Sequence, residues 1–160
     1  MNGEGRATSR RRENLLIFDF FVLLLAAKEH SMDASLLRAS FDLVAPNKEK
    51  FAAAFYDRLF ATFPETQQLF LKTDMKKQQN ALVGAIALVV SGVEKGDNIV
   101  PTLKDLGQRH STYGVKPEHY PLVGQILLET FDQFLGPEWT PEVKGAWVEA
   151  YTVIVETMTA

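Results

Sequence analysis

Apolar residues recur every three or four positions along most of the chain, which is the period of an α-helix with one buried face. Asp33 or Ser35 can cap a first such helix. Its apolar stripe consists of Leu36, Leu37, Phe41 and Val44. Pro46-Asn47 ends this helix and opens a second one. The second stripe has a strict spacing of four and consists of Phe51, Phe55, Leu59 and Phe63, with Tyr56 beside it.

The same period predicts further helices in the rest of the chain. Pro64 opens a short helical turn over residues 64–70, and the longest helix is expected over residues 75–93. Small residues on that helix, Gly84, Ala85 and Ala87, would let another helix or a flat ligand approach closely. Three more helices are expected up to His110, over residues 121–135 and from Pro141 onward. The last one carries Trp147, Tyr151, Ile154 and Met158 on one stripe.

This pattern predicts an all-α fold of about seven to eight helices. No run alternates with the period of two that strands require, and no segment repeats. The helices are unequal in length and meet at short corners. A four-helix bundle is therefore not expected, because its helices would be longer and more equal.

Residues 1–31 differ from the rest. Arg10-Arg11-Arg12 precedes an apolar run over residues 15–27 that only Asp19 interrupts, an order that imitates a signal peptide. The run is too short for an ordinary membrane span. Export or anchoring, an extra amphipathic helix and an upstream extension of the reading frame all remain open. We favour the extension, with Met32 as the usual start, a domain over residues 32–160 and a cytoplasmic protein; membrane association or export through residues 1–31 is the alternative.

Composition narrows the classes of chemistry. The 160 residues contain no cysteine, which excludes disulfides, thiolate catalysis and cysteine-ligated metal sites. A net charge of −3 gives no electrostatic case for nucleic acid as a partner. Hydrophobic residues make up 46% of the chain, so one domain with a substantial core is expected.

One histidine lies at the end of an apolar stripe. Val100, Leu103, Leu106 and Gly107 lead to His110, and Tyr113-Gly114 then stops the helix. The carbonyl of Leu106, one turn back, can accept the Nδ1–H of His110 and leave Nε2 free to bind a metal. Taken alone, a single histidine on such a stripe is more typical of a hydrogen-bonded core residue.

Four landmarks in order resemble a known family. The spacing FYxxLFxxxPxxxxLF runs from Phe55 to Phe70, and Leu106-Gly107-x-x-His110-x-x-Tyr113-Gly114-Val115 follows. The motif His119-Tyr120-Pro121-Leu122-Val123-Gly124 and the pairs Ala146-Trp147 and Ala150-Tyr151 complete the set. Residues 33–160 are thus similar to bacterial single-domain haemoglobins and to the globin module of flavohaemoglobins. The resemblance implies a globin fold around haem b (iron protoporphyrin IX).

The resemblance also implies roles for individual residues. His110 would be the proximal iron ligand, and Phe70 would pack against the porphyrin. Tyr56 would donate to bound dioxygen, and Gln78 is our choice for the distal helix position within Lys77-Gln78-Gln79, because no histidine occurs between His30 and His110. The residues expected around the cofactor are Phe70, Leu82, Leu106, His110, Val115, Tyr120 and Tyr151, and those on the distal side are Tyr56, Gln78 and Leu82.

Two features of the proximal side limit what the resemblance implies. Flavohaemoglobins carry an acidic residue further along the last helix that strengthens electron donation by the proximal histidine, and by spacing it would fall beyond residue 160. This departure puts strong peroxidase or dioxygenase character in doubt. His119 is expected at the surface or near a haem propionate, not as a second ligand.

The function expected from the resemblance is reversible binding of dioxygen or another diatomic gas, for oxygen binding and transport. The chain contains no GxGxxG and no room for flavin or nicotinamide domains after the last helix, so a self-contained flavohaemoglobin is not expected. Two alternatives remain. A separate reductase as partner would allow nitric oxide dioxygenase activity. The other alternative is a globin-fold gas sensor or interaction module, with or without haem. An enzyme is the less favoured reading.

Overall fold

The computed structural model describes residues 32–160, so the predicted extension over residues 1–31 lies outside the described part. Residues 33–160 form one compact unit. The described residues contain six α-helices, three short 3-10 helices and no strand, which confirms the all-α prediction. The α-helices are α2 (Ala34–Val44), α3 (Lys48–Thr62), α4 (Met75–Lys95), α5 (Val100–Thr112), α6 (His119–Leu135) and α7 (Pro141–Met158). The 3-10 helices are η1 (Ala45–Asn47), η2 (Pro64–Phe70) and η3 (Gly136–Glu138).

Short polar side chains set where several helices begin. The carboxylate of Asp33 accepts hydrogen bonds from the backbone N–H groups of Ser35 and Leu36, so Asp33 is the cap of α2. Asp74 caps α4 in the same way, and Thr140 caps α7 directly before Pro141. At the other end of α4, Gly96 adopts a φ of 69° and thereby terminates the helix.

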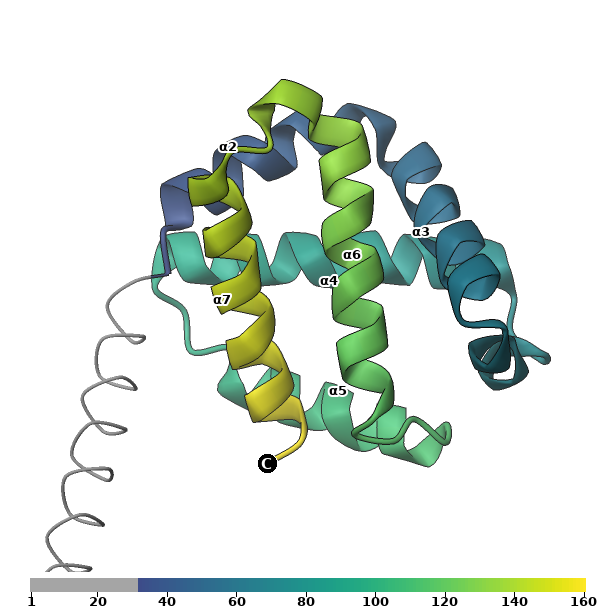
Figure 1. Cartoon of the computed structure of the whole chain (residues 1–160). Coiled ribbons are helices and arrows are strands. Elements are labelled where there is room, and N and C mark those ends of the chain that lie inside the picture. Colours follow the sequence, from purple (N-terminus) through teal and green to yellow (C-terminus); the bar gives the residue numbers. More distant parts are fainter. Residues whose placement is uncertain (1–31) are drawn as a thin grey trace, which may run out of the picture. The chain divides into compact units, whose positions relative to one another are not determined.

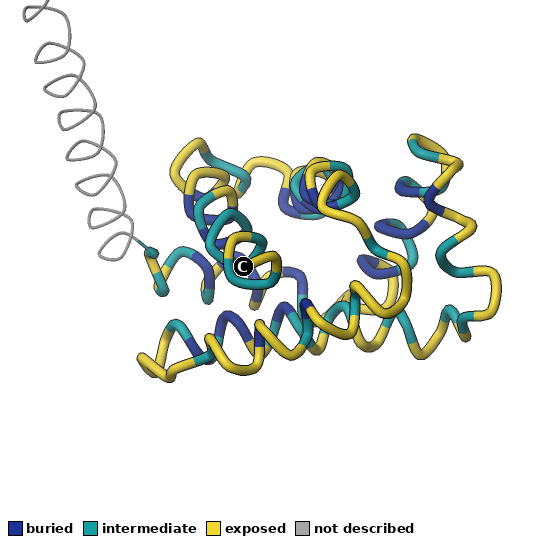
Figure 2. The backbone as a smooth tube through the Cα atoms, turned by 90° about the horizontal axis from the view of Figure 1, so that it is seen from below, coloured by how far each residue is buried: buried dark blue, intermediate teal, exposed yellow. Residues whose placement is uncertain are grey.

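The helices cross one another rather than running as a parallel bundle (Figure 1). Figure 1 shows α6 and α7 side by side, with α4 crossing behind them and α5 crossing at their lower ends. Contacts join α3 to both α4 and α6, and α7 to α2, α5 and α6. Figure 2 shows that the buried positions lie on the sides of the helices that face one another. Residues 33–160 thus share a single core.

Aromatic rings dominate the part of this core near α2. The ring of Phe131 stacks between Trp139 and Trp147, with centroid distances of 5.9 Å and 4.3 Å. The indole N–H of Trp147 donates to the hydroxyl of Ser40 at 2.9 Å. Because the buried indole N–H has a hydrogen-bond acceptor, burying Trp147 leaves no polar group without a partner. It fixes α7 against α2.

Two glycines let α7 approach its neighbours closely. A Cβ atom added at Gly107 would lie 2.0 Å from the backbone oxygen of Met158, and one at Gly124 would lie 2.4 Å from the ring of Tyr151. Neither separation is sterically allowed for a larger residue. The end of α7 therefore contacts both α5 and α6 through positions that only glycine fits.

Three local expectations differ from the structure. Helix α5 continues two residues past His110 to Thr112, and α6 begins at His119, two residues before Pro121, which its first turn accommodates. The expected close approach at Gly84 is wrong, because Gly84 is exposed and nothing lies within 4 Å of an added Cβ. No helix in the described residues combines the length and the apolar character needed to cross a membrane.

Candidate functional site

A cavity of about 250 Å³ lies between α3, η2, α4, α5, α6 and α7. It brings together all nine residues that the sequence singled out, although they come from six different elements and from the segment between α5 and α6. These residues are Tyr56, Phe70, Gln78, Leu82, Leu106, His110, Val115, Tyr120 and Tyr151. Most of the remaining lining is aliphatic or aromatic, so a ligand in this cavity would meet apolar walls and a few polar atoms.

His110 is half-buried in the last turn of α5. Its Nδ1 lies 2.8 Å from the backbone oxygen of Leu106, as the helical spacing predicts. Because a carbonyl oxygen can only accept, Nδ1 carries the hydrogen and Nε2 keeps its lone pair. The ring of Tyr120 packs against the imidazole at a centroid distance of 6.4 Å and an interplanar angle of 29°. The imidazole is thus fixed in one tautomer, with a nitrogen that can bind a metal.

The polar pair of the cavity comes from α3 and α4. The amide Nε2 of Gln78 donates to the hydroxyl oxygen of Tyr56 at 3.0 Å. Tyr56 is 4% exposed, and its ring contacts Phe55 and Phe70 edge-on. Its hydroxyl accepts from Gln78, so the hydroxyl hydrogen remains available to a ligand. Burial raises the pKa of Tyr56, which keeps the hydroxyl protonated at neutral pH.

A second tyrosine ties α7 to α6. The hydroxyl of Tyr151 donates to the backbone carbonyl of Tyr120, and its ring lies against Gly124. Burial raises the pKa of Tyr151 well above its ordinary value. Because Tyr120 packs against His110, this bond also fixes the position of the imidazole's neighbour.

The cavity includes residues that sequence reasoning missed. Ala81 on α4 and Ile154, Val155 and Met158 on α7 line it but were not expected there, whereas Ala85, which the sequence marked as permitting close approach of a flat ligand, also lines it. The helical period could have indicated them, because residues three, four or seven positions from Gln78 or Tyr151 lie on the same face of the helix.

His119 also reaches the cavity. It is half-buried and lines the cavity, and its Nδ1 accepts from the backbone N–H of Lys116 at 2.9 Å. The sequence had left a surface position and a place near the cofactor edge open, and the structure places the ring at the rim.

The described residues contain no group of three or more histidine, cysteine, aspartate or glutamate side chains that could hold a metal ion.

Comparisons with known proteins show the family to which this fold belongs. The Globin family model matches residues 53–158. The chain is 35% identical over 123 residues to a Flavohemoprotein of Bacillus subtilis, and the match covers 76% of this chain and 31% of that protein. A Flavohemoprotein of Rhodopirellula baltica is 35% identical over 116 residues, covering 71% of this chain and 28% of the relative. The chain therefore spans about a third of the length of these relatives.

A solved structure has a similar fold. It is an engineered carbene transferase from Rhodothermus marinus, described as a nitric oxide dioxygenase, with 26% identity and a TM-score of 0.69. The likeness covers 79% of this chain and 87% of that one. The family match runs from within α3 to the end of α7 and so includes the helices that line the cavity. The chain belongs to the globin family.

Proposed function

We propose that this chain binds haem b through Nε2 of His110 and reversibly binds dioxygen or another diatomic gas beside Tyr56 and Gln78. The observation that carries the proposal is one apolar cavity with a fixed imidazole from α5 and a tyrosine–glutamine pair from α3 and α4. Among the described residues, His110 alone lines the cavity with its Nδ1 bonded to a carbonyl of its own helix, which leaves Nε2 free.

The residues present fit a flat, largely apolar cofactor with a metal at its centre. His110 supplies one metal ligand, and Phe70, Leu82, Leu106 and Val115 supply apolar surface. When bound, haem b would supply an iron with an open coordination position for a diatomic ligand. The half-buried His119 at the rim would leave one edge of the cofactor near solvent.

Tyr56 would be the residue that retains the gas. Its hydroxyl hydrogen is directed by the bond from Gln78, and it can donate to a ligand that carries partial negative charge. Gln78 would orient this hydroxyl and could shift to donate to the ligand itself. Because both groups lie in an apolar cavity, each hydrogen bond is stronger than it would be in water.

A second candidate function is oxidation of nitric oxide to nitrate with a separate reductase. The names of the relatives and of the similar solved structure favour it. The chain covers only 31% of the Bacillus subtilis relative, so the remainder of that protein gives no information about this one. Turnover of nitric oxide with an added reductase, measured beside the rate of autoxidation, separates the two functions. If every reductase tested returns the iron to the ferrous state only slowly, the enzymatic function fails.

The domain boundary belongs to the same proposal. A globin domain over residues 32–160 would contain every residue of the cavity, and residues 1–31 would be an extension outside it. We further propose a cytoplasmic location for the domain.

The proposal is tested by replacing the metal ligand. His110→Ala should abolish stoichiometric haem uptake, measured as the Soret absorbance of protein titrated with haem. His119→Ala is the matched control, because this histidine lies at the rim and its Nδ1 is already engaged by Lys116. The control should take up haem normally. A normal Soret band in His110→Ala would show that the assignment is wrong.

A further inference from the structure

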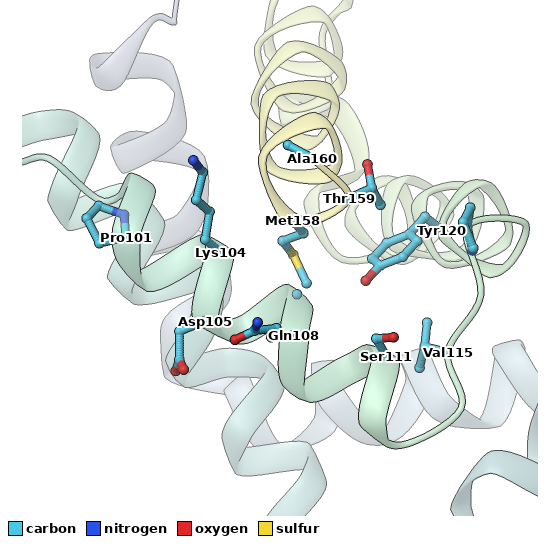
Figure 3. A pocket seen from close by; sticks show the side chains of 12 residues that line it. Pro101, Lys104, Asp105, Gln108, Ser111, Val115, Tyr120, Met158, Thr159 and Ala160 are labelled. Atoms are coloured by element: carbon cyan, nitrogen blue, oxygen red, sulfur yellow. The ribbon is translucent and has the colours of Figure 1, made fainter.

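Helix α5 has a pocket on each side. The inner cavity contains His110, and an outer pocket is lined by side chains of both charges, Lys104 and Asp105 (Figure 3). The charges of the outer pocket do not single out one class of ligand. The inner cavity shows a more specific arrangement, because aromatic rings pack around Tyr56. One of these rings belongs to Phe60, which the proposed function leaves without a role.

Phe60 contacts two aromatic residues that line the inner cavity. Its ring centroid lies 6.0 Å from that of Tyr56 at an interplanar angle of 41°, and 5.5 Å from that of Phe70 at 58°. Tyr56 and Phe70 also meet each other edge-on at 5.5 Å. The three rings therefore form a closed triangle, in which Phe60 joins α3 to η2.

Phe60 lies behind the cavity wall and not in it. Tyr56 and Phe70 line the cavity, whereas Phe60 is half-buried and is not part of the lining. Because Phe60 follows Tyr56 by one helical turn, its side chain points back over the tyrosine ring. A ligand in the cavity would therefore touch Tyr56 and Phe70 but not Phe60.

The direction of the Tyr56 hydroxyl depends on how the ring is held. The hydroxyl lies at the far end of the ring, so a tilt at the base moves the oxygen more than any other atom of the ring. Hydrogen bonds weaken steeply once the donor angle falls below about 120°. A misplacement of about 1 Å can reduce the rate of a geometry-dependent step on the order of a hundredfold. The contacts along the Tyr56 ring therefore matter as much as the bond from Gln78 to its hydroxyl.

Phe60 differs from the other rings that touch Tyr56. Phe55 and Phe70 also contact the tyrosine, but both line the cavity and would meet a cofactor directly. Among the described residues, Phe60 is thus the aromatic neighbour of Tyr56 that can be replaced without changing the lining.

We propose that Phe60 is a positioning residue for the gas-binding side of the inner cavity. It holds the rings of Tyr56 and Phe70 in one arrangement and thereby directs the Tyr56 hydroxyl at the ligand. Phe60 touches neither the cofactor nor the gas, so it acts on the gas only through Tyr56. This inference rests on the proposed function, because the hydroxyl needs a ligand to act on.

The first test compares dioxygen dissociation in a double-mutant cycle, by stopped-flow on the full-length protein loaded with haem b. Phe60→Leu removes both ring contacts and should speed dissociation by about three- to tenfold, because it misdirects the hydroxyl without removing it. In a Tyr56→Phe background the same change should alter the rate by less than about twofold, because the donor on which Phe60 acts is gone. A residue that only stabilised the fold would not show this dependence on Tyr56.

Two matched variants separate positioning from a general loss of packing. Phe51→Leu removes a ring of the same helix that contacts Phe131 and Phe134 and does not line the cavity. Phe51 is 1% exposed, so this variant should lower the melting temperature more than Phe60→Leu does, yet leave dioxygen dissociation unchanged. Phe60→Tyr keeps the ring and should retain the rate of the unmodified protein.

The second readout does not require haem. The amide Nε2 of Gln78 donates to the Tyr56 hydroxyl at 3.0 Å, so the NMR signals of this side-chain amide report where the hydroxyl lies. They are recorded on the full-length protein as purified, with reductant and carbon monoxide present so that any bound haem is diamagnetic. Phe60→Leu should shift these signals, and Phe60→Tyr and Phe51→Leu should not. If haem uptake itself fails, this readout still decides whether Phe60 positions Tyr56.

Three results would overturn the proposal. These are an unchanged dioxygen rate in a folded Phe60→Leu variant, an equal effect of Phe60→Leu with and without the Tyr56 hydroxyl, and equal effects of Phe51→Leu and Phe60→Leu on the Gln78 signals. Circular dichroism establishes that each variant is folded. Phe60→Met, a second variant without the ring, should behave as Phe60→Leu does and replaces it if the leucine variant does not fold.

Discussion

Replacing Tyr56 with phenylalanine removes one hydrogen-bond donor from the inner cavity and little else. The ring is 4% exposed and packs against Phe55 and Phe70 at centroid distances of 4.9 Å and 5.5 Å, and phenylalanine keeps these contacts. The amide of Gln78 loses its acceptor, but Gln78 is half-buried and can donate to water instead. We therefore expect the melting temperature to change little.

The expected kinetic effect follows from the hydrogen bond. Under the proposed function, the hydroxyl of Tyr56 would donate to bound dioxygen, which carries partial negative charge. A hydrogen bond to a charged acceptor contributes about 1.5–3 kcal/mol. Since about 1.4 kcal/mol corresponds to a factor of ten, Tyr56→Phe should speed dioxygen dissociation by about ten- to a hundredfold.

Stopped-flow displacement of dioxygen by carbon monoxide measures this rate. Tyr113→Phe is the matched control, because Tyr113 is 69% exposed and does not line the cavity. Carbon monoxide, a weaker acceptor, should dissociate from Tyr56→Phe at nearly the rate of the unmodified protein. An unchanged dioxygen rate would show that the hydroxyl does not reach the ligand. Equal acceleration for both gases would indicate a rearranged pocket instead of a lost hydrogen bond.

Two further predictions concern stability. Gly107→Ala should lower the free energy of unfolding in urea by about 1–3 kcal/mol, because the new methyl group meets the backbone of Met158. Gly84→Ala is the control at an exposed helix position, and it should raise the free energy of unfolding by up to about 1 kcal/mol. Burial raises the pKa of Tyr56 and Tyr151 in the folded protein above the pKa of tyrosine in the unfolded chain. The protonated hydroxyls therefore stabilise the fold fully below about pH 10, and this stabilisation is lost as the pH rises through the raised pKa values. Tyrosinate absorbance and circular dichroism recorded together should therefore show these two tyrosines ionising as the helices melt; ionisation with the helices intact would contradict the assignment.

Much of the fold could be predicted because local chemistry decides it. The caps Asp33 and Thr140 and the stop at Gly96 act within one turn of the chain, so the sequence contains their full cause. The error at Gly84 has a different origin. A small residue permits a close approach but does not require one, and the true close approaches at Gly107 and Gly124 depend on α7, which lies far along the chain.

The site also combines features with a local cause and features that depend on distant parts of the chain. The bond from His110 to Leu106 spans one helical turn and follows from spacing alone. The bond between Tyr56 and Gln78 joins two helices, and only the resemblance to a family indicated that these residues would share a cavity.

The geometry around His110 is set by α7 as much as by α5. The bond from Tyr151 to the carbonyl of Tyr120 fixes the start of α6, and Tyr120 in turn packs against the imidazole. This arrangement requires Gly124 under the Tyr151 ring, because any side chain there would displace the tyrosine and with it α7. The same displacement would separate Met158 from Gly107. The position of the imidazole's neighbour and the contact between α7 and α5 therefore depend on the same helix contact, and a substitution at Gly124 should alter both together.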